Sequence, residues 1–162
     1  MAFAIAISAL MISLPACGSG NTPTQLSSGD EKQLLAKADQ LGKELQSVTT
    51  ETVTCVRDAA LKGGGKAAVR SCLEKPLAKA GETYAGASSY VNGLSAKVSG
   101  DCKPKLKVFA DSIRKAGQTL SDSAKKLAAG DISGFQKTLS GLAAQGTEIQ
   151  NAAAALGPAC SS

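Results

Sequence analysis

Apolar residues recur at helical spacing along four stretches of the chain that follow residue 29. In each stretch, two rows of apolar positions step by seven residues and are offset by three or four, as in a helix that packs along one side. No stretch alternates apolar and polar residues in the manner of a half-buried strand. The pattern therefore predicts an all-α domain over residues 30–162.

Glycine-containing turns separate the predicted helices. The expected helices run from Asp30, as N-cap, to Gly63-Gly64-Gly65, over about 66–99, over about 103–129, and from Asp131, as N-cap, to Gly157-Pro158. Pro76 is expected to kink the second helix or to begin a fresh one. Because the connections are short, neighbouring helices are expected to be antiparallel, which predicts an up-down-up-down four-helix bundle.

The apolar rows define the expected core. On the first two helices they are Leu34, Leu41, Val48, Cys55 and Ala38, Leu45, Thr52, Ala59, then Leu77, Tyr84, Val91, Val98 and Leu73, Ala80, Ala87, Leu94. On the last two they are Leu106, Ile113, Leu120, Leu127 and Phe109, Ala116, then Phe135, Leu142, Ile149, Leu156 and Ile132, Leu139, Gly146, Ala153. Many of these residues are small, which predicts close helix packing around a thin core.

Residues 2–14 form a separate apolar run, broken only by Ser8 and Ser13. As a helix, about 13 residues span roughly 20 Å, short of the ~30 Å hydrocarbon core of a bilayer, and this is the length of the apolar part of a signal peptide. The run ends in Leu14-Pro15-Ala16-Cys17, which resembles the lipobox of bacterial lipoproteins. No Lys or Arg precedes the run, where a basic segment is expected, so we expect translation to begin upstream of Met1.

The lipobox resemblance implies cleavage between Ala16 and Cys17 and a thioether-linked diacylglyceryl group on Cys17. Residues 1–16 are then a signal peptide, residues 17–29 a lipidated cysteine with a flexible tether, and the domain is anchored on the extracytoplasmic face of the cell membrane. Cysteine parity agrees, because acylation of one of five cysteines leaves four to pair in an exported protein. The alternative is an ordinary buried apolar helix followed by a chance cysteine.

The spacing of the other four cysteines predicts their pairing. Cys55 lies about eight residues before the Gly63-Gly64-Gly65 turn and Cys72 seven residues after it, so folding at the turn places them side by side. Cys102 and Cys160 fall at the opposite end. The 30 residues from Cys72 to Cys102 span about 45 Å along a continuous helix, which excludes cross-pairing. We therefore expect disulfides Cys55–Cys72 and Cys102–Cys160. A four-thiol zinc site is disfavoured, because CxxC spacing and histidine are both absent.

Catalytic chemistry has few candidates in this sequence. Without histidine, a Ser-His-Asp triad, a Cys-His pair and imidazole metal sites are excluded. The carboxylates Glu44, Glu51 and Asp58 are expected on scattered solvated positions and suggest no acid/base pair. Gly63-Gly64-Gly65-Lys66 resembles a phosphate loop only faintly, since Ala67 follows it and no strand is predicted before it, so we interpret it as a turn. We expect no enzyme activity, catalytic residue, metal or cofactor.

Basic residues concentrate in the middle of the chain. Residues 63–130 carry twelve basic and five acidic residues, whereas the two outer helices together carry an excess of negative charge within an overall +5. Lys97, Lys103, Lys105 and Lys107 gather at the end of the bundle where the first helix begins. This basic face of helices two and three is expected to meet anionic lipids, cell-wall polyanions or an acidic face of an envelope protein. The alternative is a set of ordinary solvated lysines.

The expected function is a membrane-anchored, extracytoplasmic binding or interaction module without catalysis. Nucleic acid is not expected as a partner, because an exported protein rarely meets it and aromatic residues for base stacking are scarce. A second candidate is a carrier of an apolar small molecule, if small core residues such as Ala80, Ala87, Ala116 and Gly146 leave a cavity between the helices. A third is a structural component of the cell envelope.

Overall fold

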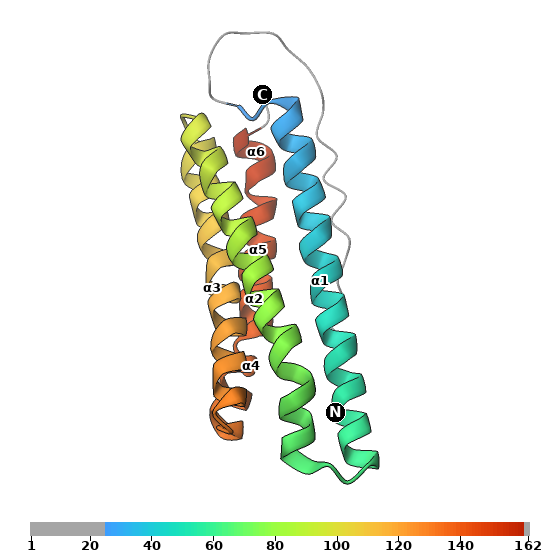
Figure 1. Cartoon of the computed structure of the whole chain (residues 1–162). Coiled ribbons are helices and arrows are strands. Elements are labelled where there is room, and N and C mark those ends of the chain that lie inside the picture. Colours follow the sequence, from blue (N-terminus) through green and yellow to red (C-terminus); the bar gives the residue numbers. More distant parts are fainter. Residues whose placement is uncertain (1–24, 161–162) are drawn as a thin grey trace.

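The structure, a computed structural model, describes residues 25–160, which are helical along nearly their whole length. In chain order the helices are α1 (Ser28–Leu61), α2 (Gly65–Lys97), α3 (Cys102–Ala128), α4 (Ile132–Ser140), α5 (Leu142–Ala154) and α6 (Leu156–Cys160) (Figure 1). No strand occurs among these residues. The predicted all-α class is confirmed.

Helix α1 begins slightly earlier than expected, with Ser27 as its N-cap. The Ser27 hydroxyl oxygen accepts a hydrogen bond from the backbone N–H of Asp30 at 3.1 Å, and the same hydroxyl donates to the Asp30 carboxylate at 2.7 Å. The prediction of Asp30 as N-cap is wrong, because the upstream serine provides the acceptor and Asp30 completes the first turn instead. Ser28 and Gly29, the last residues of the predicted tether, therefore belong to α1.

A tight glycine turn joins α1 to α2. Gly63 and Gly65 have φ angles of +64° and +54°, a region that glycine enters without steric cost. Helix α2 then continues through Pro76 as one helix, so Pro76 begins no new helix. This continuity keeps Cys72, near the start of α2, far from Cys102 at the start of α3.

The predicted fourth helix is divided into three. Asp131 is the N-cap of α4 as predicted, and its carboxylate accepts from the backbone N–H of Gly134 at 2.8 Å. Gly141 separates α4 from α5, in keeping with a cost of about 1 kcal/mol for glycine inside a helix, and Ala155 separates α5 from α6. The predicted stop at Gly157-Pro158 is wrong. Both residues lie in α6, where Pro158 falls in the first turn and needs no acceptor for a backbone N–H.

The most extensive helix contact joins α2 and α3. Every core residue predicted on these two helices is buried. The helices approach closely where Gly81 faces Gly117, because a Cβ atom on Gly117 would lie 2.9 Å from the Cβ of Tyr84 and 3.1 Å from the Gly81 carbonyl oxygen. Two turns further along, Ser88 donates a hydrogen bond to the backbone carbonyl of Ala110 at 2.8 Å. Small residues here serve close packing.

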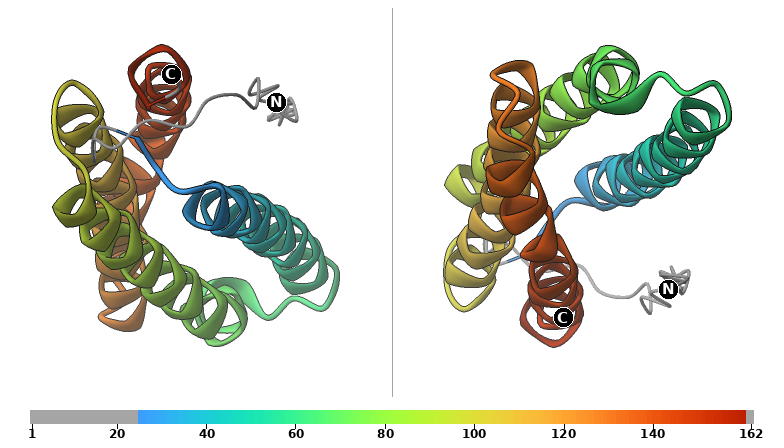
Figure 2. Two further views of the ribbon diagram at one scale, coloured as in Figure 1. Left: turned by 90° about the horizontal axis from the view of Figure 1, so that it is seen from above. Right: turned by 90° about the horizontal axis from the view of Figure 1, so that it is seen from below.

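Helix α1 lies beside α2, and within residues 25–160 its backbone comes close to that of no other helix. Figure 2 shows α1 set apart from the group formed by α3 to α6. Leu41, Val48 and Cys55 of one predicted row are buried at 7–8% exposure, and Leu34 is half-buried. Ala38, predicted in the core, is exposed, because a helix with one neighbour buries a narrower stripe than a helix enclosed in a bundle.

Both predicted disulfides are at bonding distance. Cys55–Cys72 joins α1 to α2, with the two Cα atoms 6.0 Å apart, and Cys102–Cys160 joins the start of α3 to the end of α6, with the Cα atoms 4.6 Å apart. Because these four sulfur atoms are paired with one another, they are not available as zinc ligands.

The helices lie side by side along the length of the molecule (Figure 1), and contacts link α1 to α2, α2 to α3, and α3 to each of α4, α5 and α6. A closed bundle would also join α1 to the last segment. The up-down-up-down four-helix bundle therefore stays a prediction. No helix in the described range is both long and apolar enough to span a bilayer.

Candidate functional site

The four lysines singled out in the sequence lie where α2 ends and α3 begins. Lys97 is the last residue of α2, and Lys103, Lys105 and Lys107 lie in the first turns of α3. All four are exposed, and together they are called the lysine cluster below. Lys103 and Lys107 are four residues apart and share one flank of α3, whereas Lys105 lies on the other flank. The structure thus brings the four residues to one end of the domain, although not onto one flat face.

Two interactions bring the start of α1 to the lysine cluster. Lys97 Nζ lies 3.2 Å from the Asp30 carboxylate, and the Tyr90 hydroxyl donates a hydrogen bond to Gln33 Oε1 at 3.0 Å. The Ser27 hydroxyl and the Lys97 ammonium group lower the pKa of Asp30 below its usual range, while burial raises the pKa of Tyr90. The lysine cluster therefore lies at the end of the domain where α1 begins, as the sequence predicts.

The basic residues of α3 differ in their ion pairs. The four in its middle and last part are all paired, at N–O distances of 2.9–3.7 Å: Arg114 with Asp111, Lys115 with Glu148, Lys125 with Asp122 and Lys126 with Asp131. Among the residues that the structure describes, Lys103, Lys105 and Lys107 form no ion pair. Their ammonium groups are therefore available to an external anion.

Exposed ammonium groups on flexible side chains are suited to anion binding, since each offers a point charge and three donors. The carboxylates considered for acid/base chemistry lie instead along α1, two helical turns or about 10 Å from one to the next. Each has its own partner: Glu44 lies 3.5 Å from Lys79 of α2, Glu51 accepts from Ser47 at 2.9 Å, and Asp58 lies 3.7 Å from Arg57. The structure does not bring these carboxylates together as a pair.

Two hollows that the sequence did not predict lie near the Gly63-Gly64-Gly65 turn. One, of about 480 Å³, lies between α1 and α2 beside the Cys55–Cys72 disulfide. The other, of about 350 Å³, lies between the first turns of α2 and the start of α4, and Lys66, Arg70 and Ile132 line it. In the sequence, only the three glycines of this turn marked the region around the two hollows. The interpretation of the three glycines as a turn is confirmed, and within the described range no strand precedes them.

Cys17 and the lipobox lie outside the described residues. Within residues 25–160, no group of three or more His, Cys, Asp or Glu side chains is arranged to hold a metal ion. No protein-family model matches the chain, and neither a curated protein nor a solved structure is significantly similar to it.

Proposed function

We propose that this chain is a lipoprotein of the cell envelope, anchored through acylated Cys17 on the extracytoplasmic face of the membrane, and that it acts as a non-catalytic binding module. Its lysine cluster contacts anionic groups, in the first place the phosphates of lipid head groups. We also propose that α1, α2, α3 and the α4–α6 segment form an antiparallel up-down-up-down bundle. The short links between helices and the sequence of contacts from α1 to α2, from α2 to α3 and from α3 to the last segment support the up-down order. Closure of α1 onto the α4–α6 segment is part of the proposal.

One observation carries the proposal, namely that the lysine cluster lies at the start of α1. The ion pair between Lys97 and Asp30 joins the two. The chain between Cys17 and Ser27 spans at most about 35 Å when fully extended, so an anchor at Cys17 holds this end of the domain near the bilayer. The lysine cluster is then the part of the domain closest to the lipid head groups.

The unpaired state of Lys103, Lys105 and Lys107 supports binding of an external anion. A lysine near an anionic membrane surface contributes about 1 kcal/mol, so three contribute roughly 3 kcal/mol, or about 100-fold in partitioning. By contrast, the paired basic residues further along α3 already have carboxylate partners within the protein. The charge available to the membrane is therefore concentrated at the anchored end of α3.

Close packing supports a binding module over a carrier of an apolar molecule. Ala80, Ala87 and Ala116 are buried at 0–4% exposure on the two helices that share the most extensive contact. At Gly81 and Gly117 the two helices are so close that a Cβ atom on either glycine would clash with atoms of the other helix. These small residues therefore bring α2 and α3 together, which is the more common use of small residues at helix contacts.

Flotation with lipid vesicles tests the binding. The chain from Gly18 onward, without acyl groups, is mixed with vesicles of phosphatidylcholine alone or of phosphatidylcholine with phosphatidylglycerol. We expect flotation with the anionic vesicles only, and release as the salt concentration rises. The triple variant Lys103→Gln, Lys105→Gln, Lys107→Gln should lose roughly 100-fold in partitioning.

The matched control is the triple variant Lys115→Gln, Lys125→Gln, Lys126→Gln, which makes the same change in net charge on the same helix. It should float nearly as well as the unmodified chain, because its lysines lie further along α3 and are already paired. Equal losses in the two variants, or equal flotation with neutral vesicles, would contradict a specific role of the lysine cluster.

Intact-mass analysis of the protein from its native membrane tests the anchor. The mature product should begin at Cys17 and carry the mass of a diacylglyceryl group, with the other four cysteines oxidised. A product that retains residues 1–16, or that has an unmodified Cys17, would contradict the proposed anchor while leaving the binding test above valid.

A further inference from the structure

The two disulfides differ in their access to solvent. In the Cys102–Cys160 bond both residues are buried, at 0% and 5% exposure. In the Cys55–Cys72 bond Cys55 is 7% exposed, but Cys72 is an exposed residue of α2. A reagent can therefore approach the second bond from the Cys72 side without any opening of the fold.

The Cys55–Cys72 bond also forms part of the wall of a hollow. This hollow has a volume of about 480 Å³ and lies between the end of α1 and the start of α2. Thr54, Asp58 and Lys62 contribute polar groups to its lining. It gives a thiol-bearing side chain or a small thiol room to come next to the disulfide.

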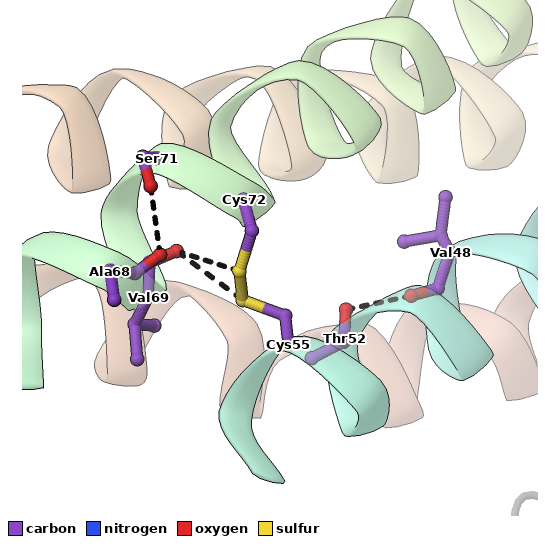
Figure 3. Close-up of a disulfide and its surroundings, with 7 residues drawn as sticks. All are labelled: Val48, Thr52, Cys55, Ala68, Val69, Ser71 and Cys72. Carbon is purple, nitrogen blue, oxygen red and sulfur yellow. Dashed lines mark hydrogen bonds between the residues drawn. A yellow bond between two sulfur atoms is a disulfide. The ribbon is translucent and has the colours of Figure 1, made fainter. Parts of the chain in front are cut away.

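The surroundings of the bond can also accommodate its reduced form. Figure 3 shows both sulfur atoms next to the backbone carbonyl oxygen of Val69, at 3.6 Å from Cys55 and 3.7 Å from Cys72. Oxidised sulfur atoms carry no hydrogen and donate no hydrogen bond to this oxygen. After reduction, this oxygen is a nearby acceptor for a hydrogen bond from either S–H group.

We propose that Cys55–Cys72 is a thiol–disulfide exchange site that accepts electrons from a dithiol reductant, and that Cys72 Sγ is the sulfur attacked. The reductant's first thiolate bonds to Cys72 Sγ while the Cys55–Cys72 bond breaks, and Cys55 leaves as a thiolate that takes up a proton. The reductant's second thiolate then attacks the reductant sulfur of the mixed disulfide and releases Cys72, which is also protonated. The reductant becomes a disulfide by loss of two electrons, and the protein gains two thiols.

Timed reduction of the mature, full-length chain tests the site. The protein is treated with dithiothreitol as the dithiol, quenched at intervals with N-ethylmaleimide, and its peptides are analysed by mass. Cys55 and Cys72 should be labelled at least about 10-fold faster than Cys102 and Cys160, because a buried bond reacts only after local opening. Equal rates for the two disulfides, or faster loss of Cys102–Cys160, would overturn the proposal.

Two double variants provide matched controls for these rates. Cys102→Ser/Cys160→Ser leaves only the exposed bond, and Cys55→Ser/Cys72→Ser leaves only the buried one. Low concentrations of urea should accelerate reduction of the buried bond and leave the exposed bond nearly unchanged, since direct attack needs no unfolding. Urea dependence of the same size in both variants would show that the exposed bond also reacts through opening, against the proposal.

A monothiol identifies the attacked sulfur. With glutathione followed by N-ethylmaleimide, the trapped intermediate should carry glutathione on Cys72 and the maleimide on Cys55. The reverse distribution, or an equal mixture of both, would overturn the assignment of Cys72 as the attacked sulfur.

Discussion

Helices α1 and α3 both pack against α2, but they are held there by different means. The large side chains with less than 2% exposure among those described lie on α2 and α3, and the two backbones come close enough at Gly81 and Gly117 to exclude a Cβ atom. The buried residues described on α1 retain 6–8% exposure. Exposed polar links supplement them: Glu44 with Lys79 at 3.5 Å, Asp30 with Lys97 at 3.2 Å, and Gln33 with Tyr90 at 3.0 Å.

The difference divides these helices into a packed body, formed by α2 and α3, and an attached helix, α1. Burial of apolar surface contributes most to a helix contact, whereas exposed ion pairs contribute about 0–1 kcal/mol each. Helix α1 therefore depends more on the Cys55–Cys72 bond than α3 depends on Cys102–Cys160. Local opening is expected to begin at α1.

Removal of each disulfide has the largest expected effect on global stability, and loop length, not the attachment of α1, sets the order of the two losses. By the entropy of loop closure, Cys102→Ser/Cys160→Ser should lower the free energy of unfolding by roughly 4 kcal/mol and Cys55→Ser/Cys72→Ser by roughly 3 kcal/mol, for sequence separations of 58 and 17 residues. Urea denaturation measures both changes.

Hydrogen exchange of the same variants shows in which helices stability is lost. In Cys55→Ser/Cys72→Ser, amide protection should fall in the second half of α1 and remain in α3, because the backbone of α1 lies close to α2 alone. Loss of protection in α3 to the same extent would mean that the body and α1 unfold as one unit.

Substitution of Gly117 by Ala tests the packed body. The new Cβ atom would meet the Cβ of Tyr84 at 2.9 Å and the carbonyl oxygen of Gly81 at 3.1 Å. We expect the free energy of unfolding to fall by about 1–3 kcal/mol, as for overpacking in a core.

Gly86→Ala on α2 is the matched control, because Gly86 is helical and exposed and its Cβ would have no neighbour within 4 Å. It should raise the free energy of unfolding by about 0.5–1 kcal/mol through helix propensity. If both alanines were stabilising in urea denaturation, the α2–α3 contact would be looser than the structure describes.

The smallest expected effect concerns the polar attachment of α1 at Asp30. Ser27 and Lys97 lower the pKa of this carboxyl in the folded protein, so its ionised form stabilises the fold. That stabilisation is fully present above the ordinary pKa of the group and is lost as the pH falls through the lower pKa of the folded state. Asp30→Asn should therefore unfold at lower urea concentration than the unmodified protein at neutral pH. The urea midpoints of the two proteins should converge in acid. A difference that grows in acid would contradict a stabilising role of the ionised Asp30.

Helix spacing and turn chemistry were sufficient to predict most of the local structure. The bounds of α2 and α3, to within two residues, and the turn between α1 and α2 follow from the glycine positions. The burial of every predicted core residue on α2 and α3 follows from the apolar rows. The pairing of the cysteines followed from the fixed rise per residue along a continuous helix. The position of the lysine cluster, at the end of the domain where α1 begins, followed from the lengths and order of the helices.

Features that depend on the neighbours of a helix were not accessible in this way. The exposure of Ala38, the division of the last segment at Gly141 and Ala155, and the choice of Ser27 over Asp30 as N-cap all differ from expectation. An apolar row shows which side of a helix is buried, but not how many helices cover it. The cap depends on which of several suitable side chains reaches a free backbone N–H.

The amino-acid sequence by itself determined the helical class, the helix bounds to within a few residues and the partners of the four cysteines, because these depend on the repeat and rise of a single helix. Only the tertiary structure decided that the backbone of α1 lies close to α2 alone, that one disulfide is buried and the other reaches solvent, and that the first lysines of α3 are unpaired while the later ones have partners. These properties depend on distances between side chains far apart in the chain, which the packing of whole helices sets.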